Sequence, residues 1–240
     1  MFYSKINHNK LVSQAIFLFV FTLSRKHTLS YNLIFLLTHP SRMEKDNSTT
    51  VLEMFRKYSE SLFPLPEKDF DHLSKVLHYK KYNKGEVVLQ EGKVCRHFWF
   101  ILKGCLRVFS LENGADVNVR FFFEQSIASD FISLRHEIPS NFFIVALEET
   151  EVLYSYKPDY KPILTFSKSL VSLTAEFFAN TLFDEIEHGN SFKLMSPEER
   201  YNSLLQTRPK YFQRIPLTYL ASYLGMSRKT LCRIRSHTAV

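Results

Sequence analysis

The residues whose types and spacing suggest a chemistry lie near the carboxyl end, in residues 217–235. Guanidinium and ammonium groups donate to phosphate oxygens and to the O6 and N7 atoms of guanine, and hydroxyls add further phosphate contacts. Residues 200–240 hold eight Lys or Arg residues and no Asp or Glu. This one-sided charge predicts a polyanionic partner, and double-stranded DNA is the obvious one. The candidate contact residues are Ser227, Arg228, Lys229, Thr230, Arg233 and Arg235.

The spacing of small and apolar residues predicts how this segment folds. If Leu217 is the first position of a twenty-residue frame, Ala221 is the fifth and Gly225 the ninth. A small residue lets two helices cross closely, and glycine supplies the positive φ of a tight turn between them. Ser227 follows as an N-cap of the second helix. Four apolar residues then form a shared seam: Leu220, Leu224, Leu231 and Ile234. An ordinary helical hairpin with solvated arginines is the alternative interpretation.

The charge of the whole chain is unevenly distributed. Its 240 residues carry a net charge of +7, of which residues 1–42 contribute +5 and residues 200–240 contribute +8, which leaves −6 for residues 43–199. Residues 43–199 are therefore not expected to bind nucleic acid. Three cysteines without a CxxC spacing argue against a disulfide framework, a structural zinc site or any other metal, and favour the cytoplasm. The chain lacks P-loop, GxGxxG, HExxH and GxSxG motifs, so we expect no enzyme.

The first 42 residues stand apart from the rest. Apolar runs at residues 11–23 and 33–37 are each shorter than the roughly 18 apolar residues that cross a bilayer. Met43 opens a polar stretch typical of the start of a soluble protein. We therefore predict that residues 1–42 are dispensable, that translation begins at Met43 and that the protein has no membrane partner. Tethering by residues 11–37 is the alternative.

Residues 43–158 predict a strand-rich domain that opens with two helices, at residues 51–62 and after Pro66. Short runs rich in Val, Ile, Phe and Tyr follow, separated by Gly85, Gly92, Gly104 and an Asn-Gly pair. The predicted strands are residues 86–90, 97–103, 106–111, 116–123, 142–148 and 151–157. Such a series is typical of an antiparallel barrel or roll, which gives the chain an α+β fold class.

A long helix is expected over residues 160–188, capped by Asp159 and ended by Gly189 and Asn190. About 28 residues span roughly 40 Å, more than a small roll can cover, so its surplus apolar face should pair with a second copy in a homodimer. Burial within one chain is the alternative. In residues 190–240 a Ser-Pro-Glu-Glu capping box at 196–199 starts a further helix, to about Gln206, before the paired helices.

A roll, a long helix and a terminal helix-turn-helix, in this order, resemble the Crp/Fnr family of bacterial transcription regulators. The ending RIPLTYLASYLGMSRKTLCRIR looks especially like the subgroup common in Bacteroidetes. The resemblance is strong over the last 40 residues and architectural before them. It implies a homodimeric, sequence-specific DNA-binding protein with a cyclic-nucleotide-binding-like roll, and RNA polymerase is a further partner to expect of such a regulator.

The family's nucleotide cassette places residues 128–130 over its Phe-Gly-Glu and residues 139–141 over its Pro-Arg-small motif. Asp130 keeps a carboxylate, but Ser140 replaces the arginine that binds the cyclic phosphate. The loss of this charge-assisted pair would cost several kcal/mol, so cyclic AMP is not expected as effector and no cofactor is assigned. The candidate ligand-pocket residues are Ser129, Asp130, Arg135, Ser140 and Asn141. A purely structural roll is an equal alternative.

The family's recognition helix carries Arg-Glu and then Arg four residues on. Arg228 and Arg233 match the arginines, but Lys229 stands in place of Glu. Lysine has no acceptor for cytosine N4, so half-sites unlike the familiar TGTGA are expected. Five residues after Arg235 leave no room for the family's β-hairpin wing, and three cysteines are too few for the family's four-cysteine iron–sulfur cluster. The main rival function is a ligand-sensing or interaction module that no longer binds DNA.

Overall fold

Residues 45–238 are described by the structure, which is a computed structural model. The expectations for residues 1–42 lie outside this range. The described residues form two compact units, one of residues 45–75 with Pro162–Thr181, and the other of Val76–Lys161 with residues 182–238. Among the described helices, none combines the length and the apolar character needed to span a bilayer.

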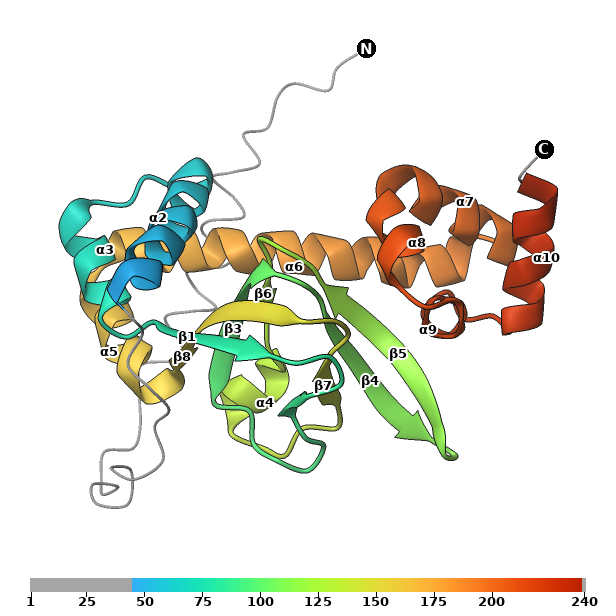
Figure 1. The fold of residues 1–240 in the computed structure, drawn as a ribbon, viewed down its shortest axis with the longest axis horizontal. Coiled ribbons are helices and arrows are strands. Elements are labelled where there is room, and N and C mark those ends of the chain that lie inside the picture. Colours follow the sequence, from blue (N-terminus) through green and yellow to red (C-terminus); the bar gives the residue numbers. More distant parts are fainter. Residues whose placement is uncertain (1–44, 239–240) are drawn as a thin grey trace, which may run out of the picture. The chain divides into compact units, whose positions relative to one another are not determined.

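The strands of the second unit form a roll of two four-stranded antiparallel sheets (Figure 1). One sheet has the order β1-β8-β3-β6 and the other β2-β7-β4-β5. The strands are β1 (His78–Tyr82), β2 (Val87–Leu89), β3 (His97–Lys103), β4 (Leu106–Glu112), β5 (Ala115–Phe122), β6 (Ile127–Ala128), β7 (Phe143–Ala146) and β8 (Thr150–Tyr156). The α+β fold class with an antiparallel roll is therefore confirmed.

The roll encloses one apolar core, to which strands of both sheets contribute buried residues. Trp99, Ile101, Leu106, Ile144 and Val152 are buried between the sheets in one core cluster. Asn113 and Gly114 both have positive φ values, of 53° and 80°, and form the tight turn between β4 and β5. All six predicted strands are present: the bounds of β3 are as predicted, and the other five have one or both ends shifted. Sequence reasoning missed β1, β6 and the short helix α4 (Phe131–His136), which are too short to show a period.

In the first unit, α2 (Lys45–Leu62) and α3 (Glu67–Ser74) match the two predicted helices that precede the roll. Pro66 lies directly before α3, whose Phe70 and Leu73 are buried. The ring of Tyr58 in α2 lies 5.9 Å from that of Phe177, between centroids.

The predicted long helix is two helices, α5 (Lys157–Phe166) and α6 (Lys168–Leu194). Both predicted ends were wrong. Asp159 lies in the first turn of α5 and does not precede it. The break comes at Ser167, whose Oγ accepts a hydrogen bond from Leu170 N at 3.1 Å and so caps α6.

At its other end, α6 runs through Gly189 and Asn190 to Leu194. Glycine within a helix costs only about 1 kcal/mol relative to alanine. Packing of the last turns offsets that cost, because His188 stacks on Tyr223 with ring centroids 4.1 Å apart and interplanar angle 7°.

The chain ends in four helices, α7 (Pro197–Thr207), α8 (Pro209–Arg214), α9 (Leu217–Tyr223) and α10 (Arg228–Thr238), here called the C-terminal bundle. The capping box is confirmed: Glu199 N donates to Ser196 Oγ and the Glu199 carboxylate accepts from Ser196 N. Helix α8 was not predicted, because six residues are too few to show a helical period.

Candidate nucleic-acid interface and ligand position

The turn between α9 and α10 has the predicted local chemistry. Gly225 adopts a φ of 65°, a conformation that strains any residue with a side chain. Thr230 N donates to Ser227 Oγ at 3.1 Å, so Ser227 caps α10 as expected. The apolar seam is closed, since Leu220, Leu224, Leu231 and Ile234 are all buried. The two helices are therefore held in one fixed relation by local contacts.

The candidate DNA-contact residues lie on the outer face of α10. Arg228, Lys229, Arg233 and Arg235 are all exposed. In residues 45–238, no ion pair involves any of these four cations. Ser227 is also exposed, whereas Thr230 is half-buried with its Oγ1 2.9 Å from Ser227 Oγ. The face is thus cationic and accessible, with two hydroxyls at its amino-terminal end.

Helix α9 packs against β5, the edge strand of the second sheet (Figure 1). Ser222 Oγ accepts a hydrogen bond from Asn118 N at 2.9 Å and donates to Asp116 O at 3.1 Å. The Arg107 guanidinium of β4 lies over the Tyr219 ring of α9, 4.0 Å from its centroid. The two Ser222 hydrogen bonds pair one amide and one carbonyl at the open edge of the sheet, where backbone groups would otherwise lack partners.

A second contact between roll and bundle is ionic. Arg214, at the end of α8, donates from Nη1 and Nη2 to the two carboxylate oxygens of Glu124, both at 2.8 Å. It also pairs with Glu148, through Nε at 3.1 Å and through Nη2. Burial would raise the pKa of Glu124, but the hydrogen bonds from Arg214 outweigh it and lower that pKa to about 2. The Glu124 carboxylate is therefore charged at neutral pH and holds the guanidinium in place.

An apolar cluster joins the same two parts. Cys105, Phe121 and Leu147 of the roll are buried together with Tyr211 and Tyr223 of the bundle. The ring of Phe121 meets both tyrosines edge-on, at centroid distances of 5.9 and 5.5 Å. Sequence reasoning missed this interface. The feature of the sequence that could have indicated this interface is the density of aromatic and basic residues in 208–223, which also fits other roles.

The predicted ligand position is occupied by the chain's own hydrogen bonds. Asp130 caps α4, and its Oδ1 accepts from Ile132 N and Ser133 N, both at 3.1 Å. Ser129 is buried and donates to His97 O at 3.0 Å. Ser140 is buried too, and its Oγ bonds to the backbone N and O of Phe142, both at 3.1 Å. The hydroxyl and carboxylate groups of these three side chains thus bond to nearby backbone groups.

The two other residues predicted to bind a ligand are Arg135 and Asn141. Arg135 is half-buried in α4, and its backbone carbonyl accepts from Lys157 Nζ at 3.3 Å. Asn141 is exposed in the bend before β7. The amides at the start of α4, which could receive a phosphate in an uncapped helix, are bonded to the carboxylate of Asp130. A second negative charge there would be repelled.

The cysteines and histidines form no metal centre in the described part of the chain, where no three His, Cys, Asp or Glu residues are arranged to hold an ion. Cys95 and Cys105 are buried, and burial raises the pKa of both thiols. Cys232 is exposed on α10. The two buried thiols are therefore protonated at neutral pH and act as small apolar side chains.

Comparisons with known proteins agree with this architecture. Residues 79–164 match the cyclic nucleotide-binding domain family. A Crp/Fnr family regulator from Eubacterium rectale superposes with a TM-score of 0.58 at 20% identity, covering 74% of this chain and 87% of that one. FixK2 from Bradyrhizobium japonicum gives 0.57 at 16% identity, with 68% and 84% covered.

CLP from Xanthomonas campestris, a regulator that responds to c-di-GMP, gives a TM-score of 0.57 at 12% identity, covering 72% of this chain and 92% of that one. No curated protein sequence matches the chain. Residues 79–164 are therefore similar to the cyclic nucleotide-binding domain family, and the chain shares its fold with these Crp/Fnr regulators.

Proposed function

We propose that the protein is a homodimeric transcription regulator that binds specific DNA sequences through α10. The observation that carries this proposal is the exposed cationic face of α10, whose four Lys and Arg residues form no ion pair within the described chain. An arginine or lysine whose charge is not neutralised on the protein is free to displace counterions from phosphates. The turn at Gly225 and the cap at Ser227 fix the direction of this face.

The base contacts are assigned to the first turns of α10. Arg228 and Lys229 are exposed there, and Arg233 follows just over one turn later. A guanidinium binds guanine O6 and N7 with two parallel hydrogen bonds, whereas an ammonium serves guanine or phosphate as a point charge. Arg228 therefore reads one guanine of each half-site, and Arg235 contacts the backbone. Neither Lys229 nor any other side chain in this set accepts a hydrogen bond from cytosine as a glutamate would.

Dimerisation is assigned to α6. Phe178, Leu182 and Ile186 follow one another at four-residue spacing and are 38, 54 and 48% exposed. Residues four apart lie on one face of a helix, so these side chains form a continuous apolar stripe. A second copy of the same stripe buries it symmetrically, as in a two-helix coiled coil. Two-fold symmetry then places the recognition helices about 34 Å apart, one turn of DNA.

Cyclic AMP is not the effector in this proposal. Ser140 supplies no positive charge for a cyclic phosphate, and Asp130 already occupies the amides of α4. A nucleotide phosphate at this position would lie next to a carboxylate without a compensating arginine. The domain thus keeps the fold of a nucleotide sensor while lacking the charge that the ligand requires.

Selection of bound sites from a random DNA pool tests the assignment. The expected result is an inverted repeat whose half-sites are one helical turn apart, bound more weakly as salt increases. Arg228→Ala should relax the preference at one base pair of each half-site. A matched control is Lys193→Ala, which removes an exposed cation from the last turn of α6. Failure to enrich any sequence, with retention no better than that of random DNA, overturns the proposal in favour of an interaction module.

A further inference from the structure

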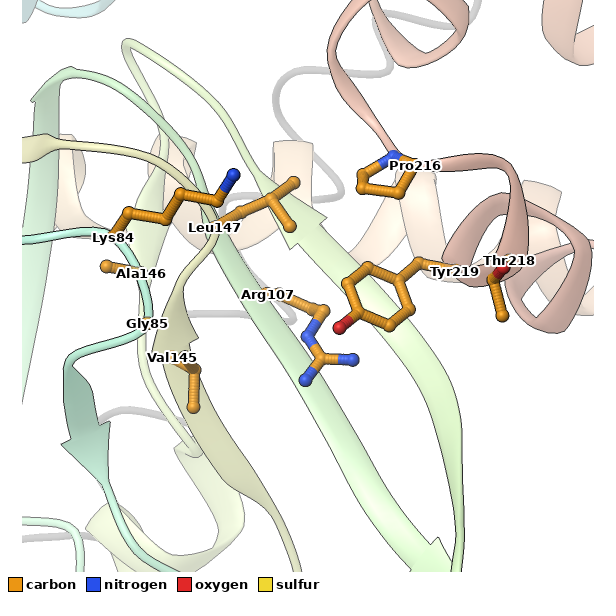
Figure 2. A pocket seen from close by; sticks show the side chains of 9 residues that line it. All are labelled: Lys84, Gly85, Arg107, Val145, Ala146, Leu147, Pro216, Thr218 and Tyr219. Atoms are coloured by element: carbon orange, nitrogen blue, oxygen red, sulfur yellow. The ribbon is translucent and has the colours of Figure 1, made fainter.

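A groove of about 610 Å³ separates the roll from the start of α9 (Figure 2). Lys84, Arg107 and Val145 line it from the roll, and Pro216, Thr218 and Tyr219 from the bundle. Its volume lies within the range of roughly 300 to 1,000 Å³ that is usual for small-molecule sites. None of the residues predicted to bind a nucleotide lines it. The groove is thus a separate place from the ligand position of the roll.

Two cations on the roll side give the groove its charge. Lys84 is exposed on the turn between β1 and β2 and forms no ion pair in the described chain. Figure 2 shows its side chain extending beside Leu147 toward Pro216. Arg107 is only 6% exposed, and its Nη1 donates to Asp116 at 2.7 Å and to Asn118 at 3.2 Å. Because Asp116 neutralises Arg107, the groove carries about one uncompensated positive charge, from Lys84.

The position of the Arg107 guanidinium is fixed by two aromatic rings. It lies 3.9 Å from the centroid of Phe109 and 4.0 Å from that of Tyr219. In residues 45–238 its Nη1 is the atom that makes hydrogen bonds, which leaves Nη2 as a donor for an added acceptor. A cation held in this way binds an anion without the loss of side-chain entropy that a mobile arginine incurs.

The other walls are apolar. Val145, Leu147 and Pro216 present hydrocarbon to the groove, and Tyr219 presents its ring (Figure 2). We propose that this groove binds a small organic anion with one negative group and an aromatic or branched aliphatic body. The negative group pairs with Lys84 and the Nη2 donor of Arg107, and the apolar body packs against Pro216 and Tyr219. A doubly charged ligand is disfavoured, because the second charge has no free cation to meet.

The ligand contacts both walls and so links small-molecule binding to the position of α9. A molecule that touches the roll and the bundle together stabilises their docked arrangement over any arrangement in which the walls separate. This consequence concerns the placement of α9 alone and does not depend on whether α10 binds DNA.

Fluorescence titration of the full chain with 8-anilinonaphthalene-1-sulfonate, an aromatic monoanion, tests the proposal. We expect a saturable component that the neutral analogue N-phenyl-1-naphthylamine does not reproduce. Lys84→Glu should weaken it by about tenfold or more, because repulsion replaces attraction at the groove. Lys84→Arg should retain it. Lys93→Glu makes the same charge change at another exposed lysine and should leave it unchanged.

A variant with a larger side chain in the groove tests the location of the binding site independently of charge. Thr218 is exposed at the groove, so Thr218→Trp should fill the space without disturbing the core and abolish the saturable component. The proposal is overturned if Lys84→Glu and Lys93→Glu weaken the dye equally, if the neutral analogue binds as tightly, or if Thr218→Trp has no effect. The affinity for DNA, measured separately, tests the proposed DNA contact by α10 and does not test the proposed anion site.

Discussion

Arg214 and Glu124 are ninety residues apart in sequence, yet their guanidinium and carboxylate groups meet through two hydrogen bonds of 2.8 Å each. Glu148 approaches the same guanidinium, and the Phe123 ring lies 4.9 Å from it. This cluster attaches the end of α8 to the roll. The bundle that carries α10 is thus fixed at two places, here and along α9.

Replacing Glu124 by Gln should destabilise the protein by about 2 kcal/mol at pH 7, as expected for loss of a charged hydrogen-bond partner. The pKa of this carboxyl is lowered in the fold, to about 2, so its contribution is complete above the unfolded pKa of about 4.5. It disappears as the pH falls from about 4.5 to about 2. Urea unfolding across this range should show a smaller pH dependence in Glu124→Gln than in the wild type.

Glu112→Gln is the matched control for that experiment, since Glu112 is exposed at the end of β4 and forms no ion pair in residues 45–238. It should leave both the stability and its pH dependence unchanged. Equal behaviour of the two variants would show that the Arg214 pair contributes nothing measurable.

The salt dependence of DNA binding separates phosphate contacts from base contacts. Each neutralised phosphate makes the slope of log K against log salt more negative by about 0.9. Loss of one contact per protomer should therefore make a dimer's slope less negative by about 2. Arg235→Ala should therefore weaken all sequences alike and flatten this slope. Arg228→Ala should instead cost about 1 to 3 kcal/mol on the selected site and less on random DNA. Anisotropy titrations at several salt concentrations measure both effects. If Arg235→Ala altered sequence preference, the assignment of Arg235 to a phosphate would be wrong.

Charges placed on the apolar stripe of α6 should prevent dimerisation. Leu182→Glu combined with Ile186→Glu introduces carboxylates that a symmetric interface would bury without partners, at a cost of several kcal/mol. The dimer should weaken by roughly 100-fold or more in sedimentation experiments. Asn180→Glu, on an exposed position of the opposite face, serves as the control. Unchanged mass of the double variant would exclude this stripe as the dimer contact.

Cyclic AMP should not alter the melting temperature, whereas removal of the Asp130 carboxylate should lower stability. Asp130→Ala loses an N-cap with two amide contacts, which typically costs about 1 kcal/mol. Differential scanning calorimetry with and without the nucleotide measures both effects. A clear upward shift on adding cyclic AMP to the wild type would show that a phosphate is accommodated without the missing arginine.

The features predicted well from sequence are those fixed by local chemistry. A glycine with positive φ, a serine cap and an apolar seam determine α9 and α10 within twenty residues, so Gly225 and Ser227 suffice to place them. The capping box at Ser196 is local in the same sense. The strands of the roll follow from short β-rich runs between glycines.

What the sequence does not reveal depends on distant partners. The cap at Ser167 divides α5 from α6, but serine within an apolar helical pattern has many other roles. Where α6 continues through Gly189, His188 stacks on Tyr223, a contact that a linear pattern does not show. The role of Asp130 as a helix cap likewise required α4, a helix too short to predict.

Gly225 has one further consequence. A β-carbon built at this position would collide with the ring of Phe192, which lies in the last turn of α6. Alanine at 225 must therefore push that aromatic ring aside. The absence of a single methyl group thus sets how closely two segments more than thirty residues apart can approach.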